Sequence, residues 1–222
     1  MLKPRIYAER CLRDEAEAVM ALIPQLDESF DQVVDLIYKT KGHVVISGVG
    51  KSGNVGAKMA ATLSSTGTPA LFVNPLDALH GDLGMITADD VLLFISNSGN
   101  TDEILRLIAA VEERHVPIVS MTGNSQSLIA RYSDYHISVY VDHEACPLNL
   151  APTSSTTAAI AMGDAIACAL MEIRGFKAND FAMFHPGGSL GRKLLLRVKD
   201  VMYTENLPVI APELKLSEAI IS

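Results

Sequence analysis

The sequence predicts an α/β fold: a doubly wound, parallel, five-stranded sheet of flavodoxin-like type, preceded by two helices. Its short apolar runs lack the two-residue alternation of half-exposed strands, which is typical of parallel strands buried on both faces. Helical patterns follow these runs, and right-handed crossovers then place helices on both sides of the sheet. The 222 residues, 49% of them hydrophobic, suffice for one domain with a sizeable core.

The predicted elements follow one another in a regular order. Two helical patterns come first, at residues 5–23 and 28–40, with Pro24 between them. The strands are expected at 43–47, 70–73, 90–95, 116–122 and 136–141. The later helices are expected at 54–65, 101–114, 125–132 and 153–174, the last with Gly175 as its C-terminal cap.

The pattern changes after Phe184. A short helix is expected near 189–197, followed by an extended stretch and the beginning of one more helix. Residues 1–200 are therefore expected to form one domain. Residues 201–222 are expected to be the truncated start of a second domain.

Composition and charge exclude several classes of protein. The net charge of −8 argues against a general nucleic-acid-binding surface. Three scattered cysteines indicate neither a disulfide framework nor a zinc cage, and a reducing compartment is the simplest location. The N-terminus lacks the apolar core of a signal peptide, and the apolar stretches are expected to fall short of membrane-spanning length. We therefore expect a cytoplasmic protein without nucleic-acid or membrane partners.

The segment 91–103, VLLFISNSGNTDE, predicts an anion site. A buried strand ends at a cluster of small polar residues, which leads directly into a helical pattern. Hydroxyl groups, an amide and the free N–H groups of a helix start favour a phosphate there, and Gly99 allows close approach. The alternative is an ordinary helix start capped by Ser98. This segment alone leaves both interpretations open.

A second glycine-rich segment, Gly48–Gly53 (GVGKSG), follows the first predicted strand. It fits the G-x-G-x-x-G pattern of dinucleotide-binding folds, but Asn74 stands where an acidic residue is expected. It fits a Walker loop poorly, because the first required glycine falls on Val45. The remaining interpretation is a tight turn that places Lys51 and Ser52 at the same sheet edge as the serine cluster.

Ionisable residues occur in other loops at this predicted edge. They are His80, Glu103, Glu144 and His185. Each has an ordinary structural interpretation when taken singly, such as a helix-start acid for Glu103 or a structural histidine. Two carboxylates, two histidines and a lysine beside a phosphate loop together indicate a catalytic site. No spacing indicates a catalytic metal.

Five segments together resemble the sugar isomerase (SIS) domain of bacterial D-arabinose-5-phosphate isomerases. They are GVGKSG, HGDLGM, SNSGNT, EACPLNLAPTSSTTAAIAMGDAIA and FHPGGSLGRKLLLRVKDVM, and the resemblance runs from about residue 40 to 203. Members of that family usually continue into a pair of CBS domains, to whose beginning residues 198–222 are similar. One departure is Asn100, where many such loops carry Glu.

The resemblance implies reversible conversion of D-ribulose 5-phosphate to D-arabinose 5-phosphate, for synthesis of the octulosonic acid Kdo in lipopolysaccharide or capsule. It implies no redox cofactor, no metal, and a homotetramer with active sites between subunits. The catalytic residues it implies are Lys51, Glu103, Glu144 and His185. The substrate-binding residues it implies are Gly50, Ser52, His80, Ser96, Asn97, Ser98, Thr101, Thr153 and Ser154.

The chemistry of an aldose–ketose interconversion assigns roles within this set. A carboxylate can move the proton between C1 and C2 through a cis-enediol, while Lys51 stabilises charge on oxygen. The resemblance does not decide which glutamate is the base. We favour Glu144, because a helix N-terminus should hold Glu103 ionised and less basic.

A non-catalytic regulatory module that binds a sugar phosphate is the alternative function. SIS modules of transcription regulators carry a DNA-binding helix-turn-helix ahead of the sensor. Here about 40 residues precede the first predicted strand, and their acidic runs give DNA binding little support. The sequence leaves open whether an isomerase would serve lipopolysaccharide, capsule or a sugar-alcohol operon.

Overall fold

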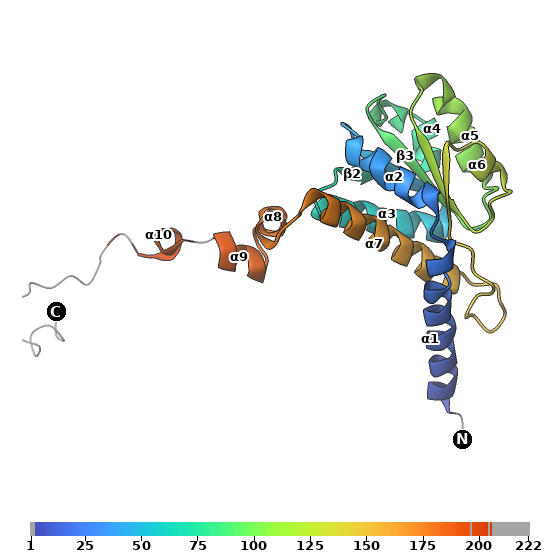
Figure 1. The fold of residues 1–222 in the computed structure, drawn as a ribbon, viewed down its shortest axis with the longest axis horizontal. Coiled ribbons are helices and arrows are strands. Elements are labelled where there is room, and N and C mark those ends of the chain that lie inside the picture. Colours follow the sequence, from blue (N-terminus) through green and yellow to red (C-terminus); the bar gives the residue numbers. More distant parts are fainter. Residues whose placement is uncertain (1–2, 196, 204, 206–222) are drawn as a thin grey trace, which may run out of the picture.

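The protein is built around a parallel five-stranded sheet with the order β2-β1-β3-β4-β5 (Figure 1). The computed structural model describes residues 3–195, 197–203 and 205. The strands are β1 (Val44–Gly48), β2 (Ala70–Phe72), β3 (Val91–Ser96), β4 (Ile118–Thr122) and β5 (Tyr135–Ser138). All four strand pairs are parallel, so the predicted doubly wound, flavodoxin-like sheet is confirmed.

Helices cover both faces of the sheet, which explains why the strands read as continuous apolar runs. On one face lie α2 (Glu28–Lys39), α3 (Gly50–Ser65) and α7 (Ser154–Arg174). On the other lie α4 (Pro75–Leu79), α5 (Asp102–Val111) and α6 (Leu128–Arg131). Every residue of β1, β3 and β4 is buried as a result, whereas the edge strands β2 and β5 are mostly half-buried.

Two segments extend from this body in Figure 1. The N-terminal helix α1 (Pro4–Met20) packs against α7 and has no buried residue. The short turn η1 (Ile23–Gln25) joins it to α2. At the other end of α7 an arm of three short helices leads away from the sheet: α8 (Ala178–Phe184), α9 (Ser189–Leu195) and α10 (Val198–Val201).

The structure corrects several predicted elements. Helix α3 begins at Gly50 rather than at residue 54, so most of GVGKSG is the first turn of a helix. The elements α4, α8, α10 and the short turn η2 (Asp82–Met85) are not predicted from the sequence, because so few residues show no helical period. The helix predicted at 101–114 ends as α5 at Val111 and continues as the short turn η3 (Glu112–Arg114). The predicted start of a second domain, residues 201–222, lies largely outside the described residues.

Helix α7 also corrects the expectation that every apolar stretch is too short to span a membrane. Its 21 residues, with a hydropathy of 1.4 over the best window, are long and apolar enough by length and composition alone. Ala158, Met162 and Ile166 recur every four residues on its buried face, in the same core cluster as β1 and β3. The apolar character therefore matches that of a core helix.

A buried carboxylate fixes the amino end of β3. Asp90 is 2% exposed, and its oxygens accept hydrogen bonds from the N–H of His43 at 2.7 Å and of Thr87 at 2.6 Å. The Thr87 hydroxyl donates a third bond at 3.0 Å. Burial by itself would raise the pKa of Asp90, but these hydrogen bonds outweigh it and lower the pKa below its ordinary value.

We expect Asp90→Ala to lower the free energy of unfolding by about 1–3 kcal/mol, because it removes a buried carboxylate that accepts three hydrogen bonds. Since the folded pKa lies below the unfolded one, the carboxylate stabilises the fold above its unfolded pKa. That contribution is lost as pH falls through the folded pKa. Urea titrations at neutral and acidic pH measure both effects. Asp89→Ala, at an exposed neighbour, is the control, and an equal loss in both variants would contradict the assignment.

Candidate active site

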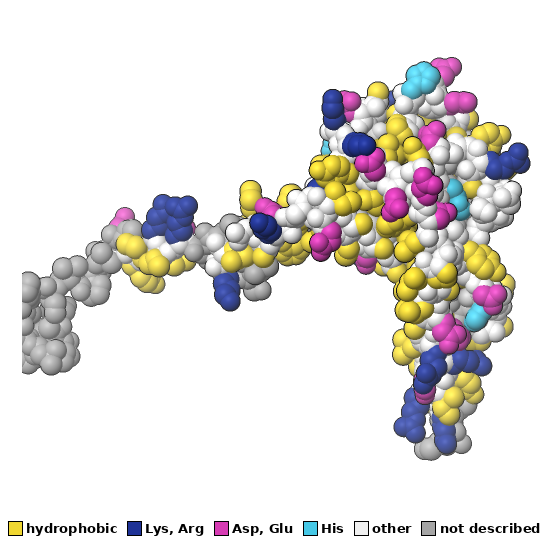
Figure 2. All heavy atoms as spheres, in the orientation of Figure 1, with side chains coloured by type: hydrophobic (Ala, Val, Ile, Leu, Met, Phe, Trp, Pro, Cys, Tyr) yellow, Lys and Arg dark blue, Asp and Glu magenta, His cyan; other side chains and the backbone are white. Residues whose placement is uncertain are grey.

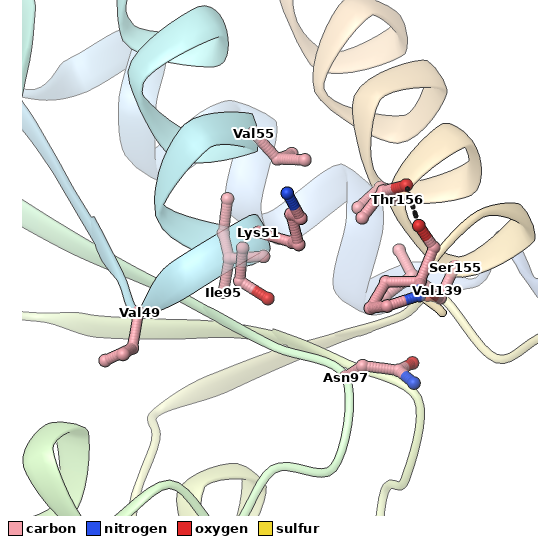
Figure 3. A pocket seen from close by; sticks show the side chains of 11 residues that line it. Val49, Lys51, Val55, Ile95, Asn97, Val139, Ser155 and Thr156 are labelled. Carbon is pink, nitrogen blue, oxygen red and sulfur yellow. Dashed lines mark hydrogen bonds between the residues drawn. The ribbon is translucent and has the colours of Figure 1, made fainter. Parts of the chain in front are cut away.

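A pocket lies at the carboxyl edge of the sheet, where the chain order reverses between β1 and β3 (Figure 3). In open α/β sheets this switch point is where ligands bind. The cavity measures about 180 Å³. It is lined by Val49, Lys51, Ser52, Val55, Ile95, Asn97, Val139, Pro152, Ser155, Thr156 and Ala159.

Lys51 brings a positive charge to this pocket from the first turn of α3. The residue before it, Gly50, has a φ of 59°, a left-handed conformation that glycine adopts without strain. In Figure 3 the ammonium group of Lys51 points into the space between α3 and α7. Lys51 is the one ionisable side chain lining the pocket within the described part of the chain. An anionic or electron-rich oxygen in the pocket would therefore meet this group.

The serine cluster forms a tight turn between β3 and α5. The Ser96 hydroxyl is 2.8 Å from that of Thr101 and accepts a bond from the Gly99 N–H at 3.0 Å. Thr101, not Ser98, precedes α5, and no side chain caps the helix start. The N-cap interpretation of Ser98 is therefore wrong, and the first N–H groups of α5 have no side-chain cap. Asn97 lines the pocket, whereas Ser96 is buried within the turn.

Glu144 anchors the loop before α7 to the first turn of that helix. One carboxylate oxygen accepts from the N–H of Thr153 at 2.7 Å and of Ser155 at 3.1 Å. The Thr153 hydroxyl donates to the same oxygen at 3.1 Å, and the Ser155 hydroxyl donates to the other. Burial would raise the pKa of Glu144, but the bonds from Ser155 and Thr153 outweigh it and lower the pKa.

Glu144 was preferred as the base because a helix N-terminus should make Glu103 less basic. The structure shows that the same reason applies to Glu144. Glu144 itself lies at a helix start and is held ionised there, as was expected of Glu103. A different reason now favours Glu144, since Ser155 both binds its carboxylate and lines the pocket. Neither glutamate lines the pocket itself. Glu144 is hydrogen-bonded to the pocket-lining Ser155, whereas Glu103 lies in the first turn of α5, on the opposite face of the sheet from α3 and α7.

Two pocket residues, Ser155 and Thr156, were missed from the sequence. Both lie in the first turn of α7, across the pocket from α3, and the Thr156 hydroxyl donates to the carbonyl of Pro152 at 3.3 Å. The two adjacent residues that were predicted to bind substrate, Thr153 and Ser154, do not line the pocket. Ser154 is fully buried and accepts from the N–H of Ala145 at 3.0 Å, and Thr153 is the residue before the helix.

The two candidate histidines do not line this pocket. His185 follows α8, beyond the carboxyl end of α7, where it stacks on Phe181 with ring centroids 3.9 Å apart. The pocket lies at the other end of α7, and a helix of 21 residues is about 31 Å long. His80 is exposed at the end of α4, and Ser98 is also exposed. One chain thus brings together Lys51, Ser52 and Asn97 of the predicted residues.

Comparison with protein families identifies the class of domain to which this chain belongs. A model of the SIS domain matches residues 36–169, which is more than half of the chain. The chain belongs to the SIS domain family.

Two curated relatives are each named arabinose 5-phosphate isomerase KdsD. The Pseudomonas aeruginosa protein is 52% identical over 202 residues, covering 90% of this chain and 62% of that protein. The Yersinia pestis protein is 47% identical over 214 residues, covering 96% of this chain and 65% of that protein. The chain therefore spans less than two thirds of the length of these relatives.

Solved structures agree with this class. The Escherichia coli CFT073 protein c3406, in complex with arabinose 5-phosphate, is 38% identical with a TM-score of 0.80. That match covers 84% of this chain and 100% of the other. The Vibrio vulnificus NanR protein, complexed with ManNAc-6P, is 17% identical with a TM-score of 0.69, over 88% of this chain and 69% of the other. At that identity the likeness shows a shared fold alone.

Proposed function

We propose that this protein is an aldose–ketose isomerase that interconverts D-ribulose 5-phosphate and D-arabinose 5-phosphate. The observation that carries the proposal is the pocket at the β1–β3 switch point, which is lined by Lys51 and by Ser155 of α7, whose hydroxyl binds the carboxylate of Glu144. The names of the relatives and the ligand of the c3406 complex support the choice of substrate. The product would enter Kdo synthesis for lipopolysaccharide or capsule.

Glu144 and the residues that line the pocket match the demands of the reaction. The carboxylate of Glu144 takes the proton from C1 of the ketose and returns it to C2, through a cis-enediol. The hydroxyl proton of O1 moves to O2, and we assign this transfer to the imidazole of His185 from a neighbouring chain. Lys51 stabilises the negative charge that grows on the substrate oxygen, and Asn97, Ser155 and Thr156 offer hydrogen bonds to hydroxyl groups. The uncapped start of α5, with Ser98 exposed next to it, suits the phosphate. We propose no metal or redox cofactor for this reaction.

We propose that residues from a second copy of the chain complete the active site. The cavity of about 180 Å³ is smaller than the roughly 300–1,000 Å³ of typical small-molecule sites. The arm carries His185 away from its own pocket and exposes apolar side chains, including Met183, Phe184 and Val201 (Figure 2). Helix α1 exposes Ile6, Tyr7 and Leu12. We assign these surfaces to a homotetramer in the cytoplasm, with His185 entering a neighbouring site.

The test is a coupled assay of the purified chain with D-ribulose 5-phosphate. We expect D-arabinose 5-phosphate at a turnover of about 1–1,000 per second, the usual range for enzymes. Protein stability in the presence of the sugar phosphate is measured in parallel. Stabilisation by the ligand without any turnover would contradict the isomerase and support the non-catalytic regulatory module.

A further inference from the structure

The side of α1 that packs against the body carries two carboxylates. The partly covered residues of this helix recur at helical spacing, at Cys11, Asp14, Glu15, Ala18 and Val19. Helix α1 packs on α7 through this side. Contact surfaces between helices are usually apolar, and acidic residues are rarely covered unless they have partners. The partners of these two carboxylates are therefore informative.

Glu15 binds the first turn of α7. Its Oε2 accepts a hydrogen bond from the Thr157 hydroxyl at 3.2 Å. The two residues before Thr157, Ser155 and Thr156, line the pocket, and Ser155 binds Glu144. A carboxylate is also favourable at the amino end of a helix. Glu15 thus contacts the pocket-lining turn of α7 from outside the pocket.

Asp14 lies near the beginning of residues 143–157, the segment whose end is bound by Glu15 through Thr157. Its Oδ2 lies 4.0 Å from Nε2 of His143, whose Nδ1 lies 3.2 Å from Oδ2 of Asp142. His143 directly precedes Glu144 in the loop that lies beside α1 in Figure 1. A cavity of about 190 Å³ separates helix and loop there, with Glu17 also on its wall.

We propose that Glu15, aided by Asp14, is a positioning residue through which α1 fixes Glu144 and the pocket face of α7. The helix holds both ends of residues 143–157: one through His143 and the other through Thr157. This inference rests on the proposed function, because it names the base whose orientation α1 controls. Displacing a reacting group by about 1 Å costs up to a hundredfold in rate, so an indirect contact of this kind affects turnover.

The first experiment compares Glu15→Ala with Glu15→Gln, which keeps an oxygen acceptor for Thr157. We expect Glu15→Ala to lower kcat about tenfold with KM within about twofold, and Glu15→Gln to stay within about twofold of the unchanged protein. Asp14→Ala/Glu15→Ala should lower kcat further than either single variant. Glu9→Ala is the matched control, since Glu9 is exposed and pairs with Arg13 on the same helix. Unchanged kcat in folded Glu15→Ala, or an equal loss in Glu15→Gln, would overturn the proposal.

A second measurement does not depend on turnover. Amide hydrogen exchange at Thr153 and Ser155 reports the bonds that Glu144 accepts. We expect faster exchange at both amides in Glu15→Ala and in Thr157→Val, and unchanged exchange in Glu9→Ala. Thr157→Ser, which restores the hydroxyl, should recover slow exchange. If the unchanged protein lacks isomerase activity, the proposed function fails, whereas unchanged exchange in both variants refutes the coupling itself.

Discussion

Glu144→Gln is expected to lower kcat about a thousandfold while leaving KM within a few fold, because it removes the group that moves the proton. The fold should survive the change. The amide oxygen can accept from the N–H groups of Thr153 and Ser155, and the amide nitrogen can donate to the Ser155 hydroxyl. Steady-state kinetics in both directions, with circular dichroism as a check of folding, measure the effect.

The matched comparison is Glu103→Gln, the other candidate base. Because Glu103 lies on α5, whereas Glu144 is hydrogen-bonded to the pocket-lining Ser155, the change of Glu103 should lower kcat much less. Glu113→Gln removes an exposed carboxylate far from the pocket and should leave kcat unchanged. A loss confined to Glu103→Gln would exchange the two roles.

The second large effect concerns Lys51 and His185. Lys51→Gln and His185→Gln should each lower activity at least about a hundredfold when either variant is assayed alone. Refolding the two together should restore activity to about a quarter of the normal level, because random association gives some sites an intact Lys51 and an intact His185 from different chains. Activity of the mixture is compared with the sum of the separate variants.

The outcome of this mixing experiment separates two arrangements. If Lys51 and His185 of one chain met in one site, every chain in the mixture would lack one group, and no activity would return. A separation of about 31 Å along α7 speaks against that arrangement. Size-exclusion chromatography confirms that mixed oligomers have formed.

The sheet could be predicted from the sequence because its strands are short apolar runs between helical patterns. The run 91–95 is buried on both faces by α3 and α5, and no exposed face interrupts it. Short helices such as α4 and α8 could not be predicted in this way, since five or seven residues give no clear period. Lys51 was found because the glycine-rich turn stands directly after a predicted strand.

The rest of the site depends on contacts that a linear sequence does not contain. Pro152, Ser155, Thr156 and Ala159 line the pocket at helical spacing, a signal that was present in the predicted helix. Extending that face from Pro152, at intervals of three and four residues, would have found Ser155 and Thr156. In contrast, the folding back of Glu144 onto α7 and the distance of His185 from the pocket follow from loop closure and from the direction of the arm. Sequence motifs carry no such information.

The central claim, that Glu144 moves a substrate proton in this pocket, is tested most directly by NMR in heavy water. D-Ribulose 5-phosphate is incubated with the protein, and deuterium is measured at C2 of the aldose formed. We expect D-arabinose 5-phosphate with deuterium at C2 from the unchanged protein, and about a thousandfold slower formation of product and of deuterated sugar with Glu144→Gln. Product formation or deuterium exchange that continues at the normal rate with folded Glu144→Gln would contradict the claim.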